Sequence, residues 1–335
     1  MNSFPSGVSV IVCCYNSVSR LEETIRHLAL QQVSENIRWE IIIINNASTD
    51  NTYETAIREC QRYPQLLNRF SVVNEPRPGL SFARERGINS SAYAYIIFCD
   101  DDNRLAADYI DLSYQIMENN LTIGALGGQS DAVTDISHFP DWFEAVKGSY
   151  AVGKQAENSR FLTKSLWGAG LITRKKLYHY CFPKEFPSYL TGRNGDKLSA
   201  GEDSEYCIRL QLKGYKIYYD ERLKFTHFIA GKRLNPDYLA RMNKGFEEAI
   251  IKLHHQTQLV DWNNAGFFGK TGILFKKILG YMSTVTGRRS WKLADLKTIL
   301  YFMSGIDTGV DADTRKIYSF YKDYHPAIEE AHDPA

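Results

Sequence analysis

The sequence predicts an α/β fold in which a mostly parallel central sheet is covered by helices on both faces, followed by a helical C-terminal extension. Three observations support this prediction. Over roughly the first hundred residues, apolar runs typical of buried strands alternate with amphipathic segments, an order typical of βαβ units. Polar residues follow the apolar runs at the points where the strands would end. From about residue 236 onward the pattern is helical to the end of the chain.

Four segments near the N-terminus have the composition of buried strands. The first is a continuous run rich in β-branched residues, which is typical of a parallel strand covered on both faces. The four predicted strands span residues 8–14, 40–44, 70–74 and 95–99. A later strand is predicted for residues 216–219.

Amphipathic segments between these strands predict helices. The first helix is expected to begin with a capping box of Ser19 and Glu22 and to place Leu21, Ile25 and Leu28 on one face. Residues 129–165 are rich in polar and turn residues, and they predict long, functional loops. Further helices are predicted for residues 52–60, 80–91 and 202–212.

The composition argues against several classes of protein. A net charge of +1 with 24% charged residues is untypical of disordered chains and of general nucleic-acid binders. The six cysteines include no CxxC pair, which argues against a zinc or redox site. The sequence has no apolar stretch of about 18 residues and no signal pattern at its N-terminus. We therefore expect a cytoplasmic protein.

Polar residues at the ends of the predicted strands are the first candidates for a site, because ligands of open α/β sheets bind at the carboxyl ends of the strands. Asp100, Asp101 and Asp102 follow an apolar run directly. Three adjacent carboxylates repel one another unless cations or full solvation compensate, and Mg²⁺ and Mn²⁺ bind carboxylate oxygens. These residues predict a metal site. The alternative is a solvated acidic loop that caps the next helix.

Four further residues are candidates for chemistry. Glu202 and Asp203 open a predicted helix, where a general base could deprotonate a hydroxyl, although carboxylates are also stabilised there by the helix dipole alone. His227 is either a metal ligand or a structural hydrogen-bonding residue. Arg84 lies on a predicted helix. It either contacts a phosphate or base, or it belongs to a solvated face of that helix.

Six motifs occur in a fixed order over about residues 7–230. They read VSVIVCCYN, IIIINNASTD, NEPRPGLSFARERGI, YIIFCDDDN, GAGLITRK and GEDSEYCIRLQLKGYKIYY. In this order and spacing the chain resembles glycosyltransferase family 2, whose members have the GT-A fold. His227 stands where that family has its late histidine. The resemblance implies transfer of a sugar from a nucleotide-diphosphate donor to an acceptor hydroxyl.

The resemblance also implies roles in donor binding. Cys13 and Tyr15 would line the nucleobase pocket, with Arg84 contacting base or phosphate. The family commonly has Asp where this chain has Asn45, and an Asn can also bond a uracil-type base, so a UDP-sugar is the favoured donor. Asp100 or Asp101 would reach the ribose or a metal-bound water.

The same resemblance implies a metal and a general base. Asp102 would coordinate Mn²⁺ or Mg²⁺, with Asp100 and His227 completing the shell. Asp203, with Glu202 as its substitute, would accept the proton of the acceptor hydroxyl during an inverting transfer. The Gln-x-x-Arg-Trp motif of processive members is missing, which favours addition of a single sugar to a saccharide or lipid-linked saccharide, for example in polysaccharide biosynthesis. A sugar nucleotidyltransferase or a non-catalytic nucleotide-sugar-binding module are the alternatives.

The chain is expected to divide near residue 230. Residues 1–230 would form the catalytic domain, with a donor half at about 1–103 and an acceptor half at about 104–230, and residues 231–335 the helical extension. Within it, residues 264–298 hold seven Lys or Arg and one acid among apolar residues. Such a segment predicts peripheral association with the inner face of a membrane. The alternative is an appendage packed on the catalytic domain with its basic face in water.

Overall fold

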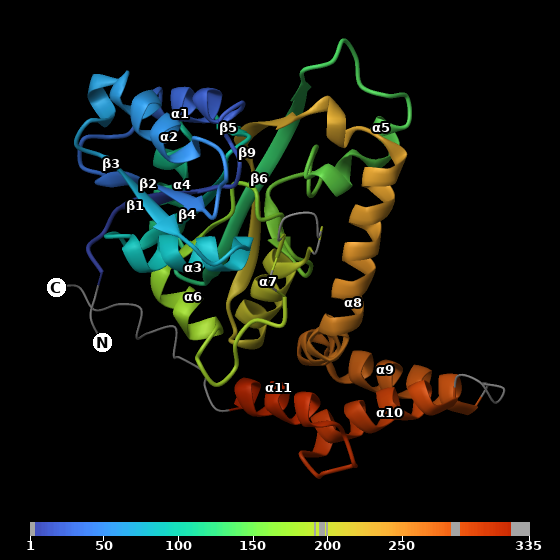
Figure 1. Ribbon diagram of the computed structural model, residues 1–335. Helices are drawn as coiled ribbons and strands as arrows, with labels where there is room; N and C mark the ends of the chain where they lie inside the picture. The colour runs from blue at the N-terminus through green and yellow to red at the C-terminus, as the bar shows by residue number, and fades with distance from the viewer. Residues whose placement is uncertain (1–3, 191, 194–197, 199, 283–288, 323–335) are drawn as a thin grey trace.

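The computed structural model describes residues 4–190, 192–193, 198, 200–282 and 289–322. Figure 1 shows a curled sheet with helices around it, from which one long helix leads to a layer of three further helices. The α/β fold class and the helical C-terminal region expected from the sequence are confirmed.

The first four strands form a parallel half-sheet in the order β3–β2–β1–β4. Successive residues of a strand point to opposite faces, so each strand contributes to two cores. Val10 and Val12 of β1 pack with α1, whereas Ile11 packs with α3 on the other face. The elements are β1 (Val8–Cys14), α1 (Leu21–Ala29), β2 (Trp39–Asn46), α2 (Thr52–Gln61), β3 (Phe70–Glu75), α3 (Leu80–Ser90) and β4 (Tyr95–Asp100). The sequence predicted each of them to within about two residues.

The predicted capping box at the start of α1 is wrong. The N-cap residue is Arg20, and no side chain caps the helix. The backbone N–H groups of Arg20 and Leu21 both donate to the carbonyl of Ser17, so a turn closed at Ser17 starts the helix. Leu21, Ile25 and Leu28 are buried on one face, as expected.

The second half of the sheet is mixed rather than mostly parallel. β8 runs antiparallel to both β4 and β6, while β6 and β9 are parallel, and β5 and β7 run antiparallel to β9. Residues 129–134 belong to a strand, not to the predicted loop, because β6 continues along β9 past a register shift at Gly128. The elements are β5 (Asn103–Leu105), α4 (Tyr109–Asn119), β6 (Ile123–Thr134), α5 (Phe143–Val146), β7 (Arg160–Leu162), β8 (Ile172–Arg174), α6 (Lys175–Cys181), α7 (Glu202–Leu212) and β9 (Lys216–Ile229).

Four helices form the C-terminal region. Asn235 caps the first of them by accepting a hydrogen bond from the Tyr238 N–H at 2.9 Å, and Pro236 occupies its first position, where a missing N–H costs nothing. The helices are α8 (Pro236–Asn264), α9 (Phe267–Met282), α10 (Arg289–Ser304) and α11 (Ala312–Lys322). Trp262, Ile299 and Phe320 share an apolar core with Phe186 and Leu212, so this region packs on the α/β part of the chain. Among the described residues, no helix has the length and apolarity needed to cross a membrane.

Candidate active site

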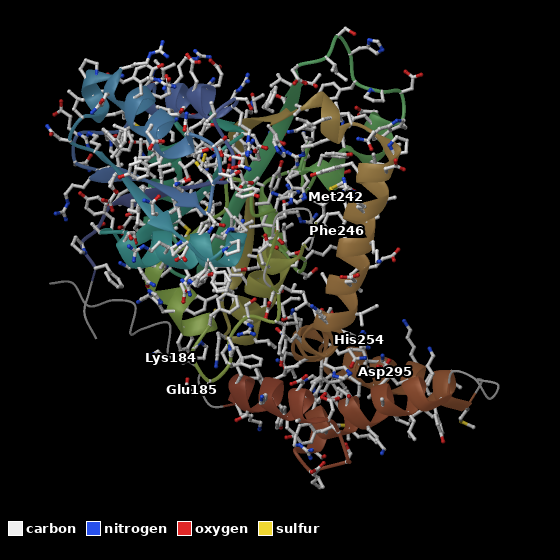
Figure 2. The ribbon with its side chains drawn as sticks, viewed as in Figure 1. Lys184, Glu185, Met242, Phe246, His254 and Asp295 are labelled. Atoms are coloured by element: carbon white, nitrogen blue, oxygen red, sulfur yellow. The ribbon has the colours of Figure 1, made fainter. Side chains whose placement is uncertain are left out.

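A cleft of about 810 Å³ opens where β1 and β4 end, and the segment after β9 together with α8 forms its far side. It contains Asp100, Asp102, Asp203 and His227, which lie far apart in the sequence. Figure 2 shows Met242 and Phe246 on the side of α8 that faces the catalytic domain, and Phe246 lines the cleft. The cleft therefore extends beyond residue 230, into the predicted C-terminal extension.

Cys13 in β1 and Tyr15 just after this strand both line the cleft. Tyr15 is 43% exposed, which leaves its ring available to a ligand. Asn16 follows in the left-handed region with φ 51°, and its side-chain oxygen accepts the Thr49 N–H at 2.8 Å. This bond ties together the loops after β1 and β2.

Asn45 does not line the cleft, contrary to its predicted role. Its amide donates to the side-chain oxygen of Asn74 at 2.9 Å, away from the site. Its neighbour Asn46 does line the cleft and accepts the Gly79 N–H at 2.9 Å. Because neighbouring residues on a strand face opposite ways, an error of one position in matching the motif moves the side chain out of the site. The sequence alone did not show which of the two asparagines faces the cleft.

Asp101 is held by its own neighbours. Arg20 binds both of its carboxylate oxygens, with Nε at 2.8 Å and Nη2 at 2.7 Å, and the Ser17 hydroxyl donates to it as well. This buried pair attaches the start of α1 to the end of β4. Arg20 also lines the cleft, and nothing in the sequence marked it as a site residue beyond its place after the first motif.

Asp100 has a carboxylate with no hydrogen bond or ion pair to any residue that the structure describes, and it lines the cleft. Burial, followed by the charge of Asp102, raises its pKa, although Arg84 opposes the shift. Asp100 is partly exposed in the cleft, and a carboxylate that is partly removed from water without a partner favours a compensating cation.

Asp102 and His227 face each other across the cleft floor. One carboxylate oxygen of Asp102 accepts from Arg233 at 2.9 Å, and the other lies 3.4 Å from His227 Nε2. His227 Nδ1 lies 2.8 Å from the carbonyl oxygen of Tyr150. A carbonyl can only accept, so Nδ1 carries a proton, and in the neutral ring the Nε2 lone pair points toward the Asp102 carboxylate.

Two acceptor atoms that face each other in this way fit a divalent cation between them. A carbonyl or carboxylate bound to the other ring nitrogen is the usual support of a histidine ligand. Asp102 and His227, with Asp100 beside them, therefore have the donor types and the orientation for Mn²⁺ or Mg²⁺. Burial acts to raise the pKa of Asp102. When no cation is bound and both ring nitrogens of His227 carry protons, the charge of that ring, followed by that of Arg233, outweighs the effect of burial and holds the pKa of Asp102 below its usual range.

Asp203 and Glu202 lie at the start of α7 with different surroundings. Asp203 Oδ2 accepts the Gly168 N–H at 2.7 Å, which fixes the carboxylate at the cleft wall. Glu202 lies 3.6 Å from the Arg84 guanidinium, and burial raises its pKa even though Arg84 opposes the shift. Arg84 is buried over the ring of Phe98, so it faces Glu202 instead of forming a solvated helix face.

The comparison with known proteins points to one family over part of the chain. Residues 9–169 match the profile of glycosyl transferase family 2. Over this segment, which is just under half of its length, the chain is similar to glycosyltransferase family 2. The matched segment runs from β1 to just before β8, so it includes the strand ends with Tyr15, Asn46 and the three aspartates.

Several curated proteins are similar to this chain. Glycosyltransferase GlyA of Streptococcus pneumoniae is 30% identical over 108 residues, which cover 32% of this chain and 14% of that protein. The glucosyl-dolichyl phosphate glucuronosyltransferase of Haloferax volcanii is 24% identical over 261 residues, covering 73% of this chain and 77% of that protein. The match to GlyA thus spans about a seventh of that protein's length.

Solved structures show the same fold. TarS 1–349 of S. aureus aligns with 97% of this chain and 90% of its own, with a TM-score of 0.50 and 14% identity. Its complex with UDP-GlcNAc aligns with 94% of this chain and 79% of its own, with a TM-score of 0.51 and 15% identity. At this identity the likeness concerns the fold, including the helical C-terminal region.

Proposed function

We propose that this enzyme transfers a single sugar from a UDP-sugar to a hydroxyl of a saccharide or lipid-linked saccharide, with inversion and with the help of a divalent metal. The observation that carries the proposal is the meeting of Asp203 with Asp100, Asp102 and His227 in one cleft. A general base and a set of metal ligands are the two parts that such a reaction requires.

The donor's base would bind near Cys13, Tyr15 and Asn46, with Arg84 close to its phosphates. Asn46 is the amide that lines the cleft, which is why we favour it over Asn45. The complex of TarS with UDP-GlcNAc supports a UDP-sugar, because that protein shares the fold along most of this chain. Asp101 would act by holding Arg20 and the loop after β1.

Asp102, His227 and Asp100 would hold Mn²⁺ or Mg²⁺. When bound, such an ion stabilises the negative charge that develops on the leaving diphosphate. The chain contributes the fixed orientation of these ligands, because Tyr150 holds the His227 ring and Arg233 holds one oxygen of Asp102.

Asp203 would act as the general base. It would take the proton of the acceptor hydroxyl as that oxygen bonds the anomeric carbon and the bond to the diphosphate breaks. One direct displacement inverts the anomeric configuration. Glu202 would assist by holding Arg84, 3.6 Å away, in the cleft wall.

We assign the transfer chemistry to residues 1–230 and a share of the acceptor side to the extension, since Arg233, Tyr238 and Phe246 line the cleft from beyond residue 230. A lipid-linked acceptor would give peripheral membrane association through residues 264–298 a purpose. Polysaccharide biosynthesis is the setting that we propose.

Calorimetric titration of UDP, GDP and dTDP, each with and without Mn²⁺, tests this proposal. We expect Mn²⁺-dependent binding of UDP that Asp102→Ala weakens by about tenfold or more. Asp141→Ala, which removes an exposed carboxylate away from the cleft, serves as the control and should bind UDP like the wild type. Absence of nucleotide binding under every condition would contradict the proposal. Binding without any sugar transfer or donor hydrolysis would leave a nucleotide-sugar-binding module.

A further inference from the structure

Several apolar side chains of helix α9 are exposed to solvent. Phe267, Phe268 and Met282 are 77%, 86% and 71% exposed, and Phe275 and Leu279 are 61% and 47% exposed. None of the residues of α9 is buried. Single exposed apolar side chains are common on protein surfaces, but a row of them along one helix marks an interaction surface.

The exposed row follows the helical period. Residues 268, 275, 279 and 282 are separated by steps of seven, four and three, which places them on one side of an α-helix. The half-buried residues Ile273, Leu274, Lys277 and Tyr281 lie on the other side, and the first two join the core shared with α10 and α11. We call residues 267, 268, 275, 278, 279 and 282 the α9 outer face.

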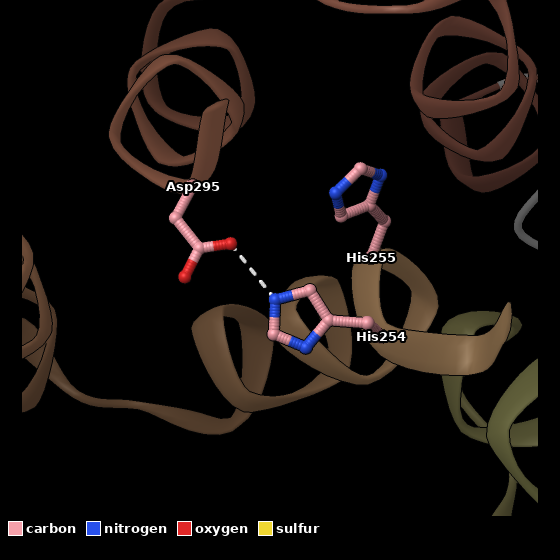
Figure 3. Close-up of side chains that lie close together, drawn as sticks. All are labelled: His254, His255 and Asp295. Carbon is pink, nitrogen blue, oxygen red and sulfur yellow. Dashed lines mark hydrogen bonds and ion pairs between the residues drawn. The ribbon is translucent and has the colours of Figure 1, made fainter. Parts of the chain in front are cut away.

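A polar cluster fixes this rotation of α9. Asp295 of α10 accepts from His254 of α8 at 2.8 Å (Figure 3). It also accepts from Lys277 of α9 at 2.6 Å. His254, His255 and Asp295 have the spacing of a metal site. However, both Asp295 oxygens already bind a donor, one of them a lysine ammonium, so the cluster joins three helices. Lys277 is thereby held on the inner side, which turns the outer face toward solvent.

The charge around the outer face has one sign. No acidic residue occurs between Asp261 and Asp295, whereas six lysines and arginines do. Lys276 is exposed beside the outer face, and Lys270 lies over the Trp262 ring at its near end. Two copies of this surface would repel each other, so the charge disfavours self-association and complements an anionic surface.

We propose that the α9 outer face inserts its phenylalanines into the headgroup region of an anionic lipid bilayer, with the surrounding lysines contacting the lipid phosphates. An apolar helix face flanked by basic residues has this behaviour at lipid surfaces. The inference extends the peripheral association considered above by naming the inserted face. It does not depend on the transfer chemistry.

Vesicle cosedimentation of the full chain tests the proposal. The wild type should bind vesicles with about 30% phosphatidylglycerol and bind pure phosphatidylcholine weakly, and about 0.5 M NaCl should weaken the anionic binding. Phe275→Ser/Leu279→Ser should reduce the partition coefficient roughly tenfold or more, and Lys276→Glu should reduce it on anionic vesicles alone. Leu30→Ser/Leu67→Ser, which changes residues 51% and 52% exposed on the catalytic domain, is the matched control and should bind like the wild type.

Two outcomes would overturn the proposal. One is equal vesicle binding by the wild type and the Phe275→Ser/Leu279→Ser variant. The other is absence of vesicle binding together with a dimer in sedimentation that the same variant converts to monomer, which would make the face a contact between copies. UDP binding should be unchanged in every variant, so failure here is separable from failure of the proposed function.

Discussion

Three consecutive aspartates have three different surroundings in the cleft. Asp101 is neutralised by Arg20, Asp102 is shared by Arg233 and His227, and Asp100 has no partner among the residues described. Successive side chains point in different directions, so the three aspartates have different neighbours. The unpaired Asp100 and the half-paired Asp102 are therefore the carboxylates available to a cation.

Asp203→Asn should lower turnover by about 10²–10⁴-fold, because a general base contributes about that much. The amide keeps the shape of the side chain and can still accept the Gly168 N–H that now reaches Asp203 Oδ2. UDP binding should therefore persist. Initial rates with saturating donor measure the effect, and near-normal turnover would remove Asp203 from its proposed role.

Glu202→Gln should change how stability depends on pH. Burial raises the pKa of Glu202 against the opposing effect of Arg84, so the ionised side chain destabilises the fold above its unfolded-state pKa. This penalty disappears as pH falls, and the glutamine variant never has it. The Tm of the wild type relative to that of the variant should therefore rise as the pH falls from about 7 to about 4, close to the pKa of an unfolded glutamate. A constant difference across this range would contradict the shift.

At the scale of elements, α7 joins the site to the helical region through a buried ion pair. Glu205 and Arg209 are both fully buried and lie 2.7 Å apart. Glu205 also accepts from Ser188 and from the Tyr189 N–H, and Arg209 donates to the carbonyl of Phe186 at 2.6 Å. The pair thus anchors the segment 186–190, which precedes the start of α7 with its two carboxylates.

Arg209→Met should destabilise the chain by about 3–5 kcal/mol, since it leaves Glu205 as a buried charge without its cation. Urea denaturation measures the loss. Arg209→Met/Glu205→Gln should recover part of it, because the second change removes the uncompensated charge. If the double variant is as unstable as the sum of its single changes, packing of Arg209 against Phe182 and Phe186 matters more than its charge.

At the scale of the whole molecule, the C-terminal region completes the cleft. Met242 is buried with Tyr150 and Ile229 of the catalytic domain, and Phe246, one turn further along α8, reaches the cleft. Arg233, just before α8, binds a proposed metal ligand. The region beyond residue 230 is therefore part of the site as well as an appendage.

Phe246→Ala should raise the KM for the acceptor several-fold and leave UDP binding unchanged, because the ring lines the side of the cleft away from β1. Ile250→Ala is the matched control, since Ile250 lies one turn along the same helix, is 68% exposed and does not line the cleft. Steady-state kinetics with varied acceptor would show the difference. Equal KM values for the two variants would exclude Phe246 from the acceptor side.

The sequence by itself determined the local elements of the first hundred residues and the residue types at the strand ends. Strand and helix periodicity are local properties, so β1 to β4 were predictable from their own segments. The mixed half of the sheet was not, because β8 and β5 have three residues each and depend on partners distant in sequence. The predicted capping box is also wrong, because backbone hydrogen bonds to the Ser17 carbonyl, and not a side-chain cap, start α1.

Only the tertiary structure decided which candidates meet and which way they face. The fold places Asn46, and not Asn45, at the cleft, and it pairs Asp101 with Arg20. It also brings Arg233 to Asp102, which lies 131 positions away in sequence. It also turned the apolar side of α9 outward, since His254, Asp295 and Lys277 from three helices fix its rotation. A hydrophobic pattern gives the period of a helix, but packing decides which of its faces is covered.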